Sequence, residues 1–369
     1  MHRTEEFAIK LDRVRRYLNR KDLDGVVLSR ADNFAWVGCG ADSLVDNSSE
    51  TGVGTLVVTL DSVVLVTNNI ESDRLLTEEL TGLEIDDART YPWHRPSERA
   101  EILAELTEDG QFVADDGCAG LPRLGGDFAR LRYELTEAEV ERYRALGSDT
   151  SAAVEHAVGD IESGMTEAQA ASLLAGACRR RGVVPIVMLV AADDRVRKWR
   201  HPVPFDGLAQ EYMMLAVCGR RQGLIAAMTR LVHFGDVPEE LARRHRAVCT
   251  VDAALISSTR PGATASEVLS AGQDAYEATG FHNEWRHHHQ GGAIGYQGRE
   301  YKATPGCREE VREPQAFAWN PSISGTKSED TILVTGHGTE VLTAASDDWP
   351  MVTVEVQGQE MQRPDILVK

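Results

Sequence analysis

Apolar positions along the first third of the chain alternate between helical and strand spacing. Residues 14–18 place their apolar side chains on one helical face, and residues 25–29 form a short apolar run after it. Two apolar runs around the turn Leu60-Asp61-Ser62 predict a β-hairpin over 55–67, and a helix is expected over 70–80. This alternation predicts a small α/β domain over residues 1–134.

The pattern changes near Leu135. Thr136 and Glu139 form a capping box that opens a long helical pattern, and Thr166 and Gln169 form a second one. Beyond residue 182, helices are predicted over 239–257 and from about 266. Strands are predicted over 185–191, 212–218, 223–234, 315–319, 331–335, 341–343 and 351–356. Helices grouped apart from an antiparallel sheet are typical of an α+β domain, here over residues 135–369.

Composition narrows the class of protein. A chain of 369 residues is too long for one ordinary domain, and 42% hydrophobic with 26% charged residues is globular composition. The net charge of −19 repels phosphate backbones and anionic membrane surfaces. No apolar run approaches the ~18–20 residues that span a bilayer, and the charged N-terminal segment lacks a signal-peptide core. We therefore expect a cytoplasmic protein with neither a nucleic-acid nor a membrane partner.

The six cysteines lie far apart, with no CxxC pair among them. In a chain with a large core, this spacing predicts reduced and mostly buried thiols. It argues against a cysteine-rich zinc site.

The densest polar cluster is His287-His288-His289, followed by Gly291-Gly292 and by Arg299-Glu300. On a strand, His287 and His289 would share one face and His288 the other. A solvated histidine-rich loop is the plain alternative. The glycines permit close approach of a ligand, and imidazole suits proton transfer near neutral pH, so the cluster is a candidate site.

Three further polar stretches carry chemically useful side chains. Lys198–Pro202, which contains His201, lies in a predicted loop between strands, where functional residues are common. Trp319-Asn320-Pro321 follows one predicted strand, and Lys327–Asp330 leads into another. Each stretch alone is more typical of a solvated surface than of a site.

The chain as a whole resembles the creatinase / proline-aminopeptidase superfamily, whose C-terminal domain has the pita-bread fold. The resemblance implies an α+β pita-bread domain behind a smaller α/β N-terminal domain. It also implies a homodimer. The stretches that carry it, in the family's order and spacing, are Arg13–Gly38, Leu135–Glu167, Gly223–Arg230, Phe317–Pro321 and Ser328–Thr335.

The departures from the family pattern concern its two metal ions. The two Asp ligands, eleven residues apart, are replaced by Ala216 and Ala227, and one Glu ligand by Asn320. Glu329 remains. The His ligand is best matched by His288, although another register of the family motif places Gly292 there. Paired divalent cations need anionic oxygens, so we predict no dinuclear metal site and no cofactor.

Creatinase itself works without metal, and its catalytic His lies in a stretch that His201-Pro202 resembles. Two of its assisting carboxylates fall on Thr229 and Asn320 here, so creatinase activity is not predicted.

The resulting hypothesis is a metal-independent hydrolase of an amide or amidine-like C–N bond in a small, polar, carboxylate-bearing molecule. His201 is the predicted general base and then acid. His288 is expected to polarise the scissile group, and Glu329 to orient a His or accept a substrate N–H. Arg299 would bind the substrate carboxylate. The residues expected to bind substrate are Arg299, Glu300, Asn320, His287, His289 and Thr229.

Two alternatives stay open at the level of sequence. One is an enzyme with a single metal ion held by the histidines 287–289 and Glu329. The other is a binding module without catalysis, similar to a histone-chaperone subunit that keeps the pita-bread fold.

Overall fold

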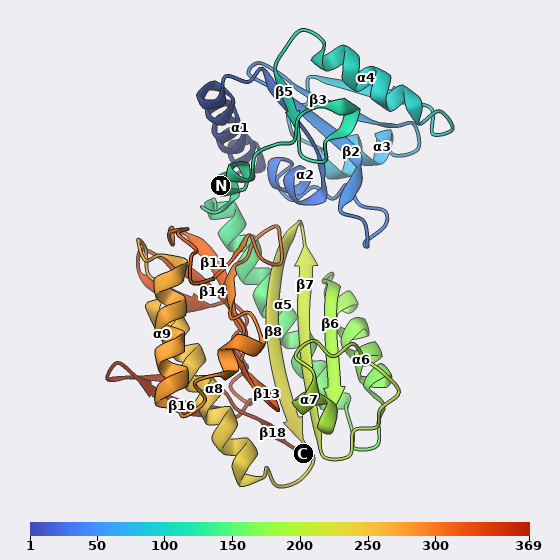
Figure 1. Cartoon of the computed structure of the whole chain (residues 1–369). Helices are drawn as coiled ribbons and strands as arrows, with labels where there is room; N and C mark the ends of the chain where they lie inside the picture. Colours follow the sequence, from blue (N-terminus) through green and yellow to red (C-terminus); the bar gives the residue numbers. More distant parts are fainter. The chain divides into compact units, whose positions relative to one another are not determined.

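The computed structural model describes all residues, 1–369, and the chain divides into two compact units (Figure 1). The first comprises Met1–Arg132 with Thr136–Glu139, and the second comprises Tyr133–Leu135 with Val140–Lys369. None of the helices combines the length and hydropathy that crossing a bilayer requires.

The first unit is a mixed five-stranded sheet in the order β4-β3-β2-β1-β5. Its helix α1 (Arg3–Lys21) buries Val14, Tyr17 and Leu18, the face predicted from their spacing. The predicted hairpin is β2–β3, whereas the helix expected over 70–80 is a short α3 followed by a π-helical turn. The other elements are β1 (Gly25–Arg30), α2 (Ala31–Val37), β2 (Thr51–Thr59), β3 (Val63–Asn68), α3 (Ser72–Arg74), β4 (Asp87–Tyr91), α4 (Ser97–Thr107) and β5 (Phe112–Ala114).

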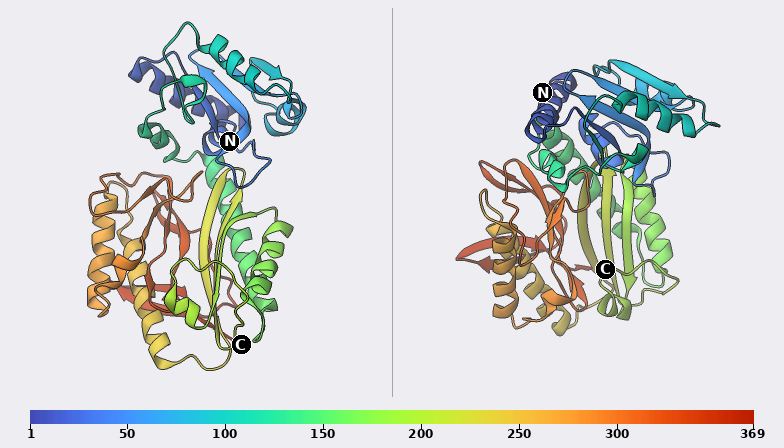
Figure 2. Two further views of the ribbon diagram at one scale, coloured as in Figure 1. Left: turned by 45° about the vertical axis from the view of Figure 1, so that its right-hand side comes forward. Right: turned by 45° about the horizontal axis from the view of Figure 1, so that its top comes forward.

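The second unit contains two main sheets with helices outside them (Figures 1 and 2). One sheet has the order β18-β8-β7-β6, and α5 and α6 lie beside it. The Thr166 hydroxyl accepts the Gln169 N–H at the start of α6, as the capping box predicts. The elements are α5 (Glu137–Asp160), α6 (Glu167–Arg180), β6 (Val184–Ala192), α7 (Asp194–Lys198), β7 (Tyr212–Arg221), β8 (Leu224–His233) and β18 (Leu367–Val368).

The other sheet of this unit has the order β10-β9-β11-β14-β15, and its core packs against α8 and α9. Tyr276, Phe317 and Trp319 are fully buried there. The last strands, β17 and β18, lie in a segment where no strand was predicted. The strand expected over 341–343 lies earlier, as β15, and residues 342–343 form a turn. The elements are α8 (Glu239–Ser258), α9 (Ala265–Ala278), β9 (Gly291–Ala293), β10 (Tyr301–Lys302), β11 (Gln315–Trp319), β12 (Ser322–Ile323), β13 (Thr326–Lys327), β14 (Asp330–Thr335), β15 (Gly338–Val341), β16 (Met351–Val356) and β17 (Gln359–Pro364).

A bridge between β8 and the start of β14 joins the two sheets. The Thr229 N–H donates to the Glu329 carbonyl at 3.1 Å, and the Thr331 hydroxyl donates to the Ala227 carbonyl at 2.9 Å. The second unit is therefore an α+β domain, as predicted, and a bridge joins its two sheets.

Four fully buried charged side chains lie beside this bridge. The Arg363 guanidinium contacts the Asp252 carboxylate at 2.7 Å and the Asp330 carboxylate at 2.6 Å, and Arg230 contacts Asp330 at 3.0 Å. Each of the four is at most 2% exposed. Because an unpaired buried charge is strongly destabilising, the network holds β8, α8, β14 and β17 in one arrangement.

Replacing Arg363 by Met should lower the free energy of unfolding by about 3–5 kcal/mol, because it leaves two buried carboxylates with too few partners. Urea unfolding measures this loss. Arg243→Met is the control, since its ion pair with Glu240 is on the surface and such pairs contribute little. Equal midpoints for the two variants would contradict the role of the network.

Candidate functional site

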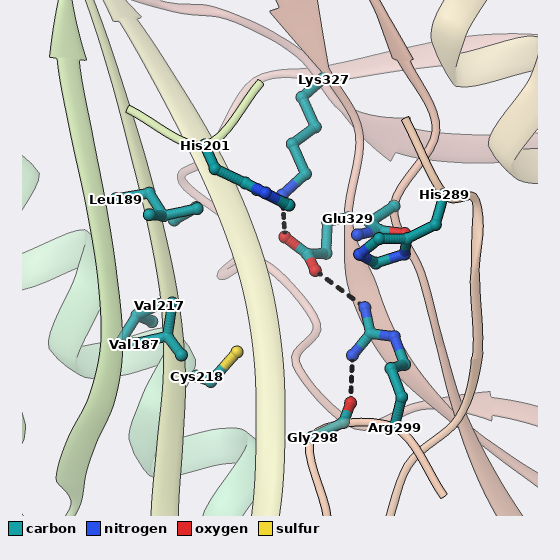
Figure 3. A pocket seen from close by; sticks show the side chains of 12 residues that line it. Val187, Leu189, His201, Val217, Cys218, His289, Gly298, Arg299, Lys327 and Glu329 are labelled. Carbon is teal, nitrogen blue, oxygen red and sulfur yellow. Dashed lines mark hydrogen bonds and ion pairs between the residues drawn. The ribbon is translucent and has the colours of Figure 1, made fainter. Parts of the chain in front are cut away.

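A cavity of about 270 Å³ opens between the two sheets of the second unit (Figure 3). Its apolar wall comes from β6 and β7 and consists of Val187, Leu189, Ala216, Val217 and Cys218. Its polar wall consists of His201, His289, Gly298, Arg299, Asn320, Lys327 and Glu329. The site is therefore divided between an apolar side and a side rich in ionisable groups.

Glu329 is the centre of the polar wall. Its Oε2 accepts from Lys327 Nζ at 2.6 Å and from the Thr229 hydroxyl at 2.7 Å, and its Oε1 lies 3.4 Å from the Arg299 guanidinium. Burial alone raises the pKa of this carboxyl, but the charges of Lys327 and Arg299 outweigh burial and lower the pKa below its usual value. Two cations thus share one carboxylate, and one positive charge is in excess.

His201, which lines the polar wall, forms a pair with His288 behind it. Their Nε2 atoms lie 3.0 Å apart, and His288 Nδ1 lies 3.2 Å from the Ser322 hydroxyl. His288 is only 8% exposed and does not line the cavity, whereas His201 does. Because both its ring nitrogens are engaged, His288 fixes the orientation of His201 and is not placed to polarise a ligand, contrary to the sequence-based expectation.

All three histidines near the cavity favour the neutral form. Burial, reinforced by Lys327, lowers the pKa of His201 and lowers the pKa of His288 to about 2. Burial, reinforced by Arg299, lowers the pKa of His289 to about 4. At neutral pH these imidazoles are proton acceptors rather than acids.

The histidine segment does not form the strand that was considered from its sequence. Residues 284–287 form a 3₁₀ turn that leaves His287 exposed, and the rings of His288 and His289 lie side by side with centroids 4.7 Å apart. The expectation that His287 and His289 share a face is therefore wrong, and His287 lies outside the cavity wall.

Glu300 also lies outside the cavity wall. Its carboxylate accepts from the backbone N–H groups of Tyr296 and Gln297 at 3.0 and 3.3 Å. It closes the loop that carries Arg299, so its place is structural. Of the other expected residues, Arg299, Asn320 and His289 line the cavity, and Thr229 reaches it through Glu329.

Lys327 lies in one of the polar stretches, and the sequence-based prediction does not include it among the site residues. It is 5% exposed and lies two residues before Glu329. Alternate residues of an extended segment point to the same side, and that spacing is the signal that would have identified it.

The positions where the family resemblance places metal ligands can be compared with the donors that the structure contains. Ala216 and Ala227 carry methyl groups, and Asn320 is a buried amide whose Oδ1 lacks a protein partner. At Gly292 a Cβ atom would lie 2.1 Å from the Tyr301 carbonyl oxygen, so this backbone has no room for a His there. Glu329 is the remaining carboxylate, and two cations already share it. This donor set offers too little negative charge for a pair of divalent cations.

Comparison with known proteins gives the family. Residues 141–336 match the model of metallopeptidase family M24, and the chain belongs to this family. An uncharacterized peptidase of Staphylococcus aureus (strain MW2) is 23% identical over 225 residues, which are 58% of this chain. The match spans 63% of that relative, less than two thirds of its length.

Solved structures agree on the fold. An Xaa-Pro dipeptidase from Bacillus anthracis has a TM-score of 0.78 at 16% identity, covering 98% of this chain and 100% of that one. The N-terminal domain of a FACT complex subunit from Cicer arietinum (chickpea) has a TM-score of 0.71 at 13% identity, covering 93% of this chain and 97% of that one. At these sequence identities, both matches show only that the chain has the pita-bread fold, and they carry no conclusion about function.

The lowered pKa of His288 predicts how stability depends on pH. Below pH 6.5 the unfolded chain binds a proton at His288, whereas the folded chain resists it down to a pKa of about 2. Stability is therefore lost progressively as pH falls from 6.5. His288→Asn should reduce the slope of the urea midpoint against pH between 6.5 and 4.5.

His282→Asn is the control for this measurement, because His282 is exposed near the same turn. A His288→Asn slope that equals the wild-type slope would show that His288 is protonated in the folded protein.

Proposed function

We propose that this protein is a metal-independent hydrolase of an amide or amidine-like C–N bond in a small molecule that bears a carboxylate. The observation that supports this most is the His201–His288 pair at a cavity where the family's metal-binding carboxylates are replaced by Ala216 and Ala227. Acid–base chemistry then falls to imidazole.

His201 is the proposed general base. In the tautomer where His201 Nε2–H donates to His288 Nε2, and His288 Nδ1–H donates to Ser322 Oγ, the lone pair on His201 Nδ1 is available. That nitrogen takes a proton from the attacking water and later gives it to the leaving nitrogen. His288 holds the ring and stabilises the imidazolium that forms between these steps.

The substrate class follows from the charges and unpartnered groups. Lys327 and Arg299 outnumber Glu329, which favours an anionic ligand. The Arg299 Nε and the Asn320 Oδ1 are buried without protein partners, and buried polar groups are normally hydrogen-bonded. A substrate carboxylate at Arg299 and an N–H group at Asn320 would satisfy both.

Replacing His201 by Ala should lower kcat by roughly 10²–10⁴-fold, since general acid–base help is lost, with a smaller effect on KM. The assay is release of amino acid from a panel of N-acyl and N-carbamoyl amino acids. His282→Ala is the matched control, because it removes an exposed His of the same unit. An unchanged kcat in His201→Ala would refute the assignment.

One observation favours a second candidate, an enzyme with a single metal ion. Ring nitrogens of His201, His288 and His289 all lie within 4.8 Å of one another, and neutral imidazoles bind zinc and related ions. The sequence-based version of this alternative used the exposed His287, which lies outside this trio.

Metal analysis separates the two candidates. Untagged protein, purified without added metal, should contain no stoichiometric transition metal and should keep its turnover after dialysis against a chelator. Stoichiometric metal that is required for turnover would replace the first candidate by the second.

A further inference from the structure

Hydrolysis of an amide without a metal ion needs a group that stabilises the negative charge on the carbonyl oxygen. His288, expected from the sequence to do this, lies behind His201 and has both ring nitrogens engaged. The cationic side chains that line the cavity are Arg299 and Lys327. One of these two side chains is therefore the candidate for stabilising the negative oxygen.

Both terminal nitrogens of Arg299 already contact protein groups, which leaves its buried Nε for the substrate carboxylate. One of its terminal nitrogens donates to the Gly298 carbonyl at 2.5 Å, and the other lies 3.4 Å from Glu329. Its planar guanidinium also suits a planar carboxylate, the role already proposed for it. A compact point charge is better suited to an oxygen that changes from carbonyl to oxyanion.

Lys327 has N–H donors that its protein contact does not use. Its ammonium carries three N–H donors, and its contact in the protein is Glu329 Oε2 at 2.6 Å. Glu329 also accepts from Thr229 and contacts Arg299, so its charge is balanced without Lys327. Burying a second cation beside one carboxylate is unfavourable, and negative charge on a bound ligand would offset that cost.

The backbone fixes Lys327 relative to the base. Lys327 on β13 pairs with Ser322 on β12, and the Ser322 side chain contacts His288. The hairpin is anchored to α8 through His245 Nδ1, 2.8 Å from the Thr326 hydroxyl. The paired residues Ser322 and Lys327 therefore fix two things together. Ser322 holds His288, which orients His201, and Lys327 carries the ammonium.

We propose that Lys327 is a catalytic residue whose ammonium donates to the carbonyl oxygen of the scissile bond, an inference that rests on the proposed function. Water attacks the carbonyl carbon as His201 takes its proton, and the C=O electron pair moves to the oxygen beside Lys327. The electron pair on the oxygen then re-forms the C=O bond, the C–N bond breaks, and the His201 imidazolium protonates the leaving nitrogen. The products are a carboxylic acid and an amine.

The first experiment replaces Lys327 by Met and follows the N-acyl and N-carbamoyl amino acid panel. Loss of one oxyanion donor should lower kcat by roughly 10²–10³-fold, with little change in KM. Lys302→Met is the matched control: Lys302 is exposed and off the cavity wall, although its charge acts on His201 and His289. A kcat for Lys327→Met as high as that of the control would overturn the proposal.

A second comparison separates contact with substrate from neutralisation of Glu329. In a Glu329→Gln background the carboxylate charge is gone, so a lysine that only balances that charge becomes dispensable. If Lys327 contacts the oxyanion, adding Lys327→Met to Glu329→Gln lowers kcat by a further ~10²-fold. Equal rates for E329Q and the K327M/E329Q double variant would overturn the proposal. The double variant also serves if the single one does not fold, because it removes both charges of the pair.

A binding measurement keeps the inference distinct from the proposed function. Methylphosphonate, a small tetrahedral oxyanion, should bind the wild-type protein in calorimetry and bind Lys327→Met at least ~10-fold more weakly. If the wild-type protein hydrolyses none of the panel, the proposed function fails while this measurement still supports Lys327 as the oxyanion site. Equal affinity in both proteins, or no binding to either, overturns the assignment of Lys327.

Discussion

The buried pairing of Arg363 with Asp252 and Asp330 is the interaction on which the rest of the second unit depends. It draws together a helix and strands that are far apart in the sequence. Asp330 directly follows Glu329, and its second cation, Arg230, directly follows Thr229. The ion network therefore sets the backbone positions from which Thr229 and Glu329 meet, and the geometry of the cavity follows from that meeting.

The polar wall reverses the charge arrangement expected of the family's metal sites. Anionic side chains around cations are replaced by cationic side chains around one anion, Glu329. The overall charge of −19 repels anions at long range, whereas the positive charges of Lys327 and Arg299 favour an anion inside the cavity. Screening by salt weakens the distant repulsion more than the contact with buried groups.

Much of the fold was predictable because its signals are local. The capping box at Thr166 and the apolar runs of β7 and β8 need only neighbouring residues to be interpreted. His201, Arg299, Asn320 and Glu329 were predicted through resemblance, and they line one cavity. The exposure of His287 depends on a 3₁₀ turn, and the burial of Lys327 depends on a hairpin packed on α8. The apolar pattern does not mark the 3₁₀ turn over 284–287, and the packing of the hairpin on α8 depends on His245, which is distant in the sequence.

The division of the cavity into two walls has a consequence for how its ligand range can change. The ionisable side chains come from loops and from the β12–β13 hairpin, while the apolar side chains Val187, Leu189 and Val217 come from β6 and β7. Enlarging or shrinking those side chains would reshape the space and leave the polar wall in place. Substitutions confined to these two strands would therefore change the bulk of the molecule that fits the cavity, while its ionisable groups keep their positions.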